Sequence, residues 1–120
     1  TGVGRTGKFY AYQHQQILPD ILTTAKGLGN GIPIGACLAH GRAAQLFKPG
    51  NHGSTFGGNP FASRIALTVI ETIAQNHLAE NAAQRGEQLF MGLKNSMGHL
   101  NGVKEIRGKG LMMGIELDKP

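Results

Sequence analysis

The sequence predicts an α/β fold, and three observations support this prediction. Short β-branched or apolar runs at residues 21–24 and 32–39 are typical of strands. Apolar residues then recur at helical spacing over 61–73 and again over 78–97. Glycines cluster between these segments, as they do where a chain turns tightly or approaches a ligand.

The N-terminal half alternates short elements with glycine loops. The elements that we expect are, in order, a glycine-rich loop (1–7), one or two helical turns (8–14), a strand (21–24), a glycine loop (27–31), a second strand (32–39), a short helix (41–47) and a long glycine-rich loop (48–58).

The clearest helix follows this loop. Asn59 is a favourable N-cap, and Pro60 occupies the first helical position, where its missing N–H costs nothing. A second helix is expected from Leu78 to Met97. Two strands, 103–107 and 111–117, should complete the chain, joined by a turn at Gly108-Lys109-Gly110. Composition changes near Gln75-Asn76, which indicates a domain boundary there.

Charge and composition exclude several classes of partner. The formal net charge is +5, but the densest basic group, Lys104, Arg107 and Lys109, has no interleaved aromatic residues. We therefore expect no nucleic-acid partner, whereas an anionic small molecule fits. No apolar run approaches the about 18 residues of a transmembrane helix, so no membrane partner is expected.

Cysteine and histidine patterns point to no metal. Cys37 is the single cysteine, which fits a reducing, cytoplasmic location and excludes a disulfide framework. The histidines lie far apart, without the spacing of metal ligands. Thr1 is not a start methionine, so the chain reads as an internal fragment from which targeting signals could be absent.

Residues 2–8 match most of a P-loop, G-x-x-x-x-G-K, and residues 2–7 match G-x-G-x-x-G. Phe9 stands where a P-loop needs Ser or Thr for magnesium, and no preceding strand can be seen. A nucleotide-binding module at this loop is kept as an alternative of a different class.

Lys26 is the most informative residue. It follows a predicted strand end and precedes the glycine loop 27–31, and open α/β sheets bind their ligands at such strand ends. A lysine there can attack a carbonyl once its amine is deprotonated. The plain alternative is a solvated surface lysine.

A second loop, HGSTFGGNP, places Ser54 and Thr55 among glycines just before a helix. Free backbone N–H groups, hydroxyls and the positive end of a helix dipole together suit a phosphate. An ordinary capping loop would explain Asn59 and Pro60, but not the paired hydroxyls.

Four segments then make a specific pattern: TGVGRTGKFYAYQ, PDILTTAKGLGNGIPIGA, HGSTFGGNP and IRGKGLMMGIEL, in this order. Together they resemble the class III, pyridoxal 5'-phosphate (PLP)-dependent aminotransferases, most of all the acetylornithine type. The likeness covers nearly all of the 120 residues. It implies a fragment of a fold-type I PLP-dependent transferase, with residues 1–76 ending the large mixed-sheet domain and 77–120 beginning the small C-terminal α+β domain.

The resemblance also implies site residues. Lys26 would be the catalytic Schiff-base lysine that binds PLP, and Thr55 would bind the cofactor phosphate in the other subunit of a homodimer. Ser54 matches a position beside the substrate. Arg107 matches the arginine of the R-G-x-G-L motif, near the substrate carboxylate or its acidic partner, although a surface arginine in a basic turn is the plain alternative.

The implied reaction transfers an amino group from N2-acetylornithine to 2-oxoglutarate, a step of arginine biosynthesis that gives N-acetylglutamate 5-semialdehyde and glutamate. Sister enzymes use ornithine, succinylornithine or 4-aminobutyrate, and these substrates stay open. The family's aspartate partner of the pyridine nitrogen, its phosphate loop and its α-carboxylate arginine would precede Thr1. This stretch alone is therefore expected to lack activity, and a purely dimer-forming fragment is a further alternative.

Overall fold

A computed structural model describes residues 2–118 of the chain. These residues form two compact units, one of residues 12–75 and one that combines residues 2–11 with 76–118. Each unit contains one two-stranded antiparallel sheet and one long helix. The predicted alternation of helices and strands is confirmed.

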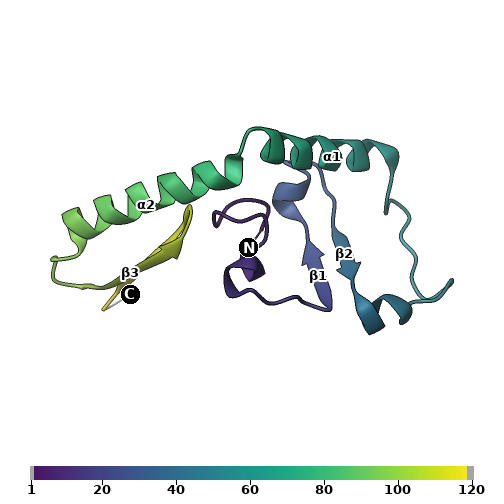
Figure 1. The fold of residues 1–120 in the computed structure, drawn as a ribbon, viewed down its shortest axis with the longest axis horizontal. Helices are drawn as coiled ribbons and strands as arrows, with labels where there is room; N and C mark the ends of the chain where they lie inside the picture. Colours follow the sequence, from purple (N-terminus) through teal and green to yellow (C-terminus); the bar gives the residue numbers. More distant parts are fainter. Residues whose placement is uncertain (1, 119–120) are drawn as a thin grey trace. The chain divides into compact units, whose positions relative to one another are not determined.

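The unit of residues 12–75 is built around a short hairpin-like sheet (Figure 1). Its elements are, in order, most of the 3-10 helix η1 (Ala11–Gln15), strand β1 (Ile21–Thr24), the 3-10 helix η2 (Lys26–Leu28), strand β2 (Ala36–Ala39), the 3-10 helix η3 (Gly41–Gln45) and helix α1 (Pro60–Gln75). β1 pairs antiparallel with β2, with Ile21 opposite Ala39 and Thr24 opposite Ala36. η2 contacts α1.

Helix α1 begins as predicted. The Asn59 side chain accepts a hydrogen bond from the N–H of Ala62 (2.9 Å), so Asn59 caps the helix directly before Pro60. Ala62 and Ala66 lie one helical turn apart and are buried, as is Leu28 of η2.

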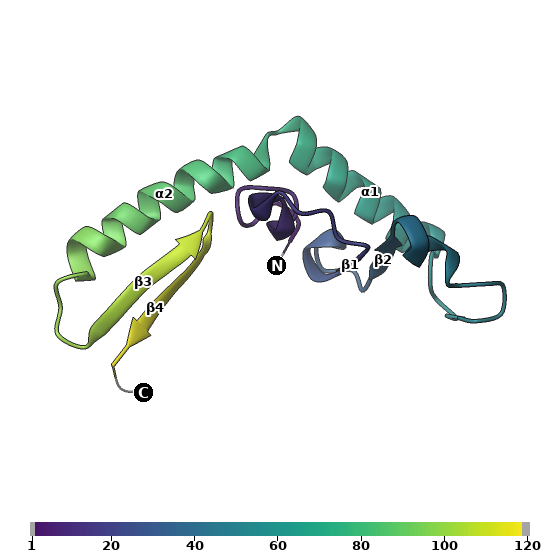
Figure 2. The ribbon, with the colours of Figure 1, turned by 60° about the horizontal axis from the view of Figure 1, so that its bottom comes forward.

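The second unit pairs helix α2 (Leu78–Met97) with a β-hairpin of β3 (Val103–Lys109) and β4 (Met112–Leu117). Figure 2 shows α2 running along the hairpin, and its contacts are mainly with β3. The pairing shifts between Val103, opposite Leu117, and Glu105, opposite Glu116. Lys104 is the extra residue of this β-bulge.

The bulge decides which side chains of β3 face the helix. Val103 and Ile106 are half-buried, while Glu105 and Arg107 are exposed. Without the extra residue, Val103 and Ile106 would point to opposite faces of the strand. The charged residues therefore share the face that α2 does not cover.

Three expected elements differ in their bounds. The strand predicted over 32–39 contains only Ala36–Ala39, because Ile32 donates its N–H to Gly29 (3.0 Å) in a turn and Pro33 has no N–H to give. The helical turns expected over 8–14 and 41–47 are the 3-10 helices η1 and η3.

The hairpin turn also lies later than predicted. Gly108 and Lys109 belong to β3, opposite Met113 and Met112, and the chain reverses at Gly110 and Leu111. A side chain at Gly108 would collide with the carbonyl oxygen of Met112, so this glycine serves close strand packing and not a turn.

In sequence the chain passes from one unit to the other between residues 11 and 12 and again between residues 75 and 76. The assignment of residues 1–76 and 77–120 to a large and a small domain of the family fold stays a prediction. Within residues 2–118, no helix combines the length and the apolar composition that crossing a membrane requires.

Candidate functional site

Lys26 occupies a strained backbone position directly after β1. Its φ is 50°, in the left-handed region, whereas the preceding Ala25 is extended. This conformation costs a residue with a side chain about 1–2 kcal/mol, and glycine or asparagine is the usual occupant. Strain of this kind often occurs at functional sites, but Val3, Gln16, Asn30 and His77 also have a positive φ. Among these five residues, Lys26 is the one with a primary amine.

The turn that carries Lys26 is firmly held while its side chain is exposed. The N–H of Gly29 donates to the Lys26 carbonyl (3.0 Å), and the N–H of Leu28 donates to that of Ala25 (3.1 Å). Leu28 is buried, and a side chain at Gly29 would collide with the Ile32 carbonyl. Among residues 2–118, no carboxylate forms an ion pair with the Lys26 amine.

The loop 48–58 presents Ser54 and Thr55 to solvent. Neither hydroxyl is hydrogen-bonded to any part of the described chain, residues 2–118. A Cβ at Gly57 would lie 2.8 Å from the Ser54 Oγ, so the loop needs glycine to fold back on Ser54. Gly58 has a φ of 68°, which again favours glycine. The glycines thus shape a turn that exposes two hydroxyls.

Asn59 joins this loop to α1. Its Nδ2 donates to the Phe56 carbonyl (2.9 Å), while its Oδ1 accepts from Ala62. The N–H of Ser63 donates to the Asn59 carbonyl (3.0 Å). The chain itself thus provides acceptors for most of the backbone N–H groups at the start of α1. The hydrogen-bond donors left for a phosphate are the hydroxyls of Ser54 and Thr55 and the backbone amides of the loop.

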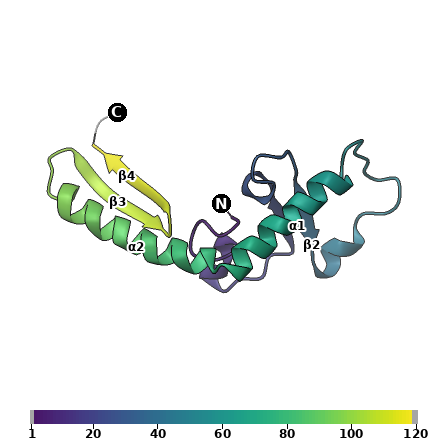
Figure 3. The ribbon, with the colours of Figure 1, turned by 90° about the horizontal axis from the view of Figure 1, so that it is seen from above.

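Lys26 and the Ser54-Thr55 pair lie in different parts of the unit. η2 follows β1 and lies beneath α1, while the loop 48–58 extends on the far side of β2 and η3 (Figures 1 and 3). The three ribbon views agree on this arrangement. The ribbon views therefore place η2 and the loop 48–58 in different parts of the unit.

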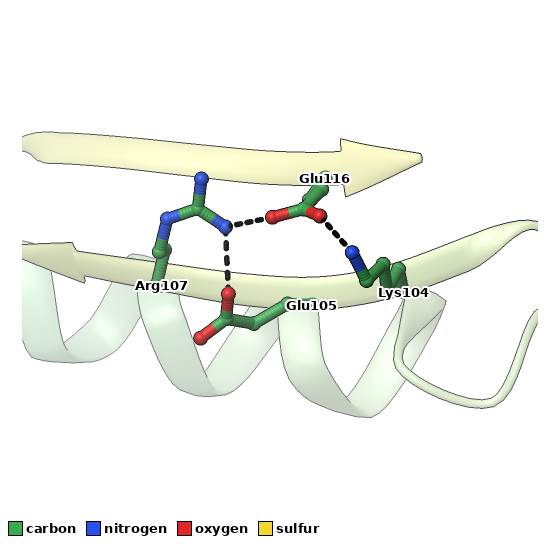
Figure 4. Close-up of polar contacts among 4 residues, drawn as sticks. All are labelled: Lys104, Glu105, Arg107 and Glu116. Atoms are coloured by element: carbon green, nitrogen blue, oxygen red, sulfur yellow. Dashed lines mark hydrogen bonds and ion pairs between the residues drawn. The ribbon is translucent and has the colours of Figure 1, made fainter. Parts of the chain in front are cut away.

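Arg107 lies in the second unit, at the centre of a charge network on the hairpin (Figure 4). Its Nη1 donates to Glu105 Oε2 and to Glu116 Oε2, both at 2.6 Å. Lys104 Nζ donates to the other oxygen of Glu116 at 2.5 Å. Two cations and two carboxylates thus balance on the exposed face of β3 and β4.

The network shifts two pKa values. The pKa of the Glu116 carboxyl lies below its usual value because Lys104 donates to it, and Arg107 adds to the effect. The pKa of Arg107 lies above its usual value because Glu116, and then Glu105, accept its hydrogen bonds. Arg107 therefore stays charged, and both its hydrogen bonds leave from Nη1.

A shallow pocket of about 460 Å³ lies beside this network. The residues that line it are Thr6, Arg107, Gly108, Lys109, Met112, Met113 and Gly114. Thr6 is buried although it belongs to the N-terminal loop. Two cationic side chains, Arg107 and Lys109, on a largely apolar wall suit an anionic ligand with a short carbon chain.

Sequence reasoning did not identify Glu105, Glu116, Lys104 or Thr6 as neighbours of Arg107. Period-two alternation within β3 would have placed Glu105 and Arg107 on one face. The bulge at Lys104 and the strand register have no comparable sequence signal.

Comparison with known proteins identifies the family. The model of the aminotransferase class-III family matches residues 1–120, the whole chain. The chain therefore belongs to the class III aminotransferases, and the resemblance seen in the four sequence segments is confirmed.

Individual relatives agree with this family. The acetylornithine aminotransferase of Nitrosomonas europaea is 53% identical over 119 residues, which cover 99% of this chain and 30% of that protein. A structure of acetylornithine aminotransferase from Elizabethkingia anophelis matches with a TM-score of 0.91 at 36% identity, covering 99% of this chain and 30% of the other.

A structure of the ornithine aminotransferase from Toxoplasma gondii, with partial occupancy of PLP at its active site, matches with a TM-score of 0.92 at 39% identity. That match covers 98% of this chain and 28% of the other. The chain thus spans about 30% of the length of the curated relatives it matches, and the fold prediction of a PLP-dependent aminotransferase fragment is confirmed.

Proposed function

We propose that the full-length protein transfers the δ-amino group of N2-acetylornithine to 2-oxoglutarate, giving N-acetylglutamate 5-semialdehyde and glutamate, with PLP as cofactor. Relatives named acetylornithine aminotransferase support acetylornithine as the amino donor. The structural observation behind the proposal is Lys26, an exposed lysine without an ion pair among residues 2–118, held in a left-handed turn after a strand end.

The described residues fit PLP in two respects. Lys26 would bind the cofactor covalently through Nζ, which no carboxylate in residues 2–118 engages. Thr55 would bind the phosphate with its exposed hydroxyl, helped by the amides of the glycine loop. PLP, when bound, supplies the electron sink that makes the amine-bearing carbon acidic.

Lys26 is proposed to move the proton in this reaction. Its amine, once freed by the incoming amino substrate, would take the proton from the amine-bearing carbon of the substrate and deliver it to a carbon of the cofactor. The backbone hydrogen bonds of the turn fix the point from which the Lys26 side chain extends. A fixed point of attachment would help to position Nζ for proton transfer.

Ser54 and Arg107 are proposed to bind the substrate. Arg107 uses Nη1 for both glutamates, and Figure 4 shows Nη2 pointing away from them. A guanidinium edge of this kind suits bidentate recognition of a carboxylate. The pocket beside Arg107 would hold the short carbon chain of a dicarboxylate such as 2-oxoglutarate.

A homodimer is proposed, with Thr55 serving the partner's site. The separation of the loop 48–58, which carries Thr55, from η2, which begins at Lys26, supports this arrangement. The cytoplasmic location expected from the sequence stays a prediction.

The proposal is tested by following glutamate production in the full-length, PLP-loaded protein with a panel of amino donors. We expect N2-acetylornithine to give the highest kcat/KM with 2-oxoglutarate as acceptor. A higher kcat/KM for ornithine, succinylornithine or 4-aminobutyrate would identify a sister aminotransferase. Absence of transamination with every donor would reject the proposed activity.

The nucleotide-binding alternative gains no support from the local structure. After Gly7 the chain continues through irregular residues to the 3-10 helix η1, and no α-helix begins at Lys8 as a P-loop requires.

A further inference from the structure

Three distant segments of the second unit meet backbone to backbone. They are Arg5–Gly7 of the N-terminal loop, Ala83–Gly86 of α2 and Gly110-Leu111 of the hairpin turn, and we call this contact the glycine junction. The substrate-binding role proposed above for Arg107 was argued without the residues of the glycine junction.

The first contact of the junction joins α2 to the hairpin turn. Gly86 is buried, and a Cβ there would collide with the carbonyl group and the Cα of Gly110. Backbone and not a flexible side chain fills this space, so the turn itself would have to move to admit even a methyl group.

The second contact joins the turn to the N-terminal loop. The N–H of Leu111 donates to the Arg5 carbonyl (2.9 Å). Gly110 has a φ of 54°, and a Cβ there would lie 2.6 Å from the Arg5 oxygen and 2.8 Å from the Gly7 nitrogen. Glycine is required here both by the backbone conformation and by the lack of space.

The third contact closes the junction. Gly7 has a φ of 90°, and a Cβ there would lie 2.8 Å from the Cβ of Ala83. Loop, helix and turn thus contact one another in pairs, and a shift of one must displace the others. Arg107 lies on β3 three residues before Gly110 and shares its pocket with the buried Thr6 of the loop.

From this geometry we infer that Gly86 and Gly110 are positioning residues for Arg107. They set how closely the hairpin turn approaches the N-terminal loop, and hence where the guanidinium stands relative to the pocket wall formed by Thr6. The inference rests on the proposed function, because it concerns the carboxylate substrate assigned to Arg107.

The test uses the full-length, PLP-loaded protein with four variants: Gly86→Ala, Gly92→Ala, Arg107→Ala and the double variant Gly86→Ala/Arg107→Ala. Gly92 is the matched control, since it lies on the same helix and a Cβ there meets nothing within 4 Å. The measurements are kcat, the KM for 2-oxoglutarate, its dissociation constant by calorimetry without amino donor, and hydrogen exchange of the Leu111 amide.

We expect Gly86→Ala to raise the KM and the dissociation constant of 2-oxoglutarate about tenfold, since a charged hydrogen bond is misplaced, with kcat within about twofold. Exchange of the Leu111 amide should accelerate. Gly92→Ala should change none of these. In the Arg107→Ala background, Gly86→Ala should add no further loss of binding, because the residue through which it acts is gone.

Two results would overturn the inference. The first is a Gly86→Ala effect of equal size with and without Arg107, or one confined to kcat, which would make the junction a purely structural contact. The second is an unchanged affinity for 2-oxoglutarate in Arg107→Ala. This result would show that Arg107 does not bind the carboxylate substrate, even if the protein still catalyses transamination.

If the proposed function is wrong, the unaltered protein will show no transamination. The dissociation constants of 2-oxoglutarate measured by calorimetry then still test whether Gly86 and Gly110 position Arg107. If Gly86→Ala does not fold, Gly7→Ala replaces it under the same criteria, since its Cβ meets Ala83 at the other side of the junction.

Discussion

Lys26 and Arg107 are two basic candidate residues, one in each unit, and the two units hold them in opposite ways. Lys26 has a strained backbone, with a φ of 50°, and a side chain without an ion pair in residues 2–118. Arg107 has the regular backbone of a strand and a side chain engaged by Glu105 and Glu116. With the roles proposed for them, the reacting amine of Lys26 is left without an ion pair among residues 2–118, whereas the recognition group of Arg107 is oriented by its neighbours.

The comparison is tested most severely by removing the nucleophile while keeping the charge. Lys26→Arg should lower kcat by about a thousandfold or more, because arginine stays protonated and cannot form the covalent link or move the proton. Lys48→Arg, an exposed lysine of the same unit, is the control and should keep activity. Turnover of the Arg variant near the unaltered rate would mean that Lys26 contributes only charge.

Close backbone packing in the unit that contains Arg107 predicts that two glycine-to-alanine substitutions in helix α2 change the free energy of unfolding in opposite directions. Gly86→Ala should lower the free energy of unfolding by about 2 kcal/mol, because the junction with Gly110 is overpacked. Gly92→Ala should raise it by about 0.5–1 kcal/mol through helix propensity. Denaturant unfolding measures both, and equal signs would contradict the described packing.

In the unit that carries Lys26, the N-cap residue Asn59 holds the loop 48–58, which carries the hydroxyls of Ser54 and Thr55, against helix α1. Asn59→Ala should lower the free energy of unfolding by about 1 kcal/mol and weaken PLP binding, because Asn59 also holds Phe56. Asn59→Ser keeps a capping oxygen and should retain most of the stability. If the affinity for PLP does not change in Asn59→Ala, the loop does not depend on its cap.

Backbone strain at Lys26 predicts a difference between two inactive variants. Lys26→Gly should be more stable than Lys26→Ala by about 1 kcal/mol, because glycine adopts a positive φ without penalty. Thermal unfolding of the two variants, both without cofactor, measures the difference. Equal stability would show that the turn relaxes when the lysine is absent.

The charge network around Arg107 predicts a small pH dependence. Because the folded pKa of Glu116 is lowered, its stabilising effect is present above the unfolded value of about 4.3 and is lost as the pH falls through the folded value. The stability advantage over Glu116→Gln should therefore shrink in acid, and less so when both proteins carry Lys104→Ala. An advantage that grows in acid would contradict the network.

Much of this arrangement could be predicted from sequence. Strand β1, the cap at Asn59, and helix α2 follow from local signals, and Lys26 stands out because it joins a strand end to a glycine loop. The partners of Arg107 could not be predicted, since they depend on a bulge at Lys104 and on strand register. The burial of Thr6 depends on contacts between segments far apart in sequence.

The central claim, that Lys26 is the cofactor lysine, is tested most directly by reducing the full-length, PLP-loaded protein with borohydride and mapping its peptides by mass spectrometry. We predict a single pyridoxyl group, on the peptide that contains Lys26, and none in Lys26→Ala. A pyridoxyl group on another lysine, or a covalent cofactor retained by Lys26→Ala, would contradict the account.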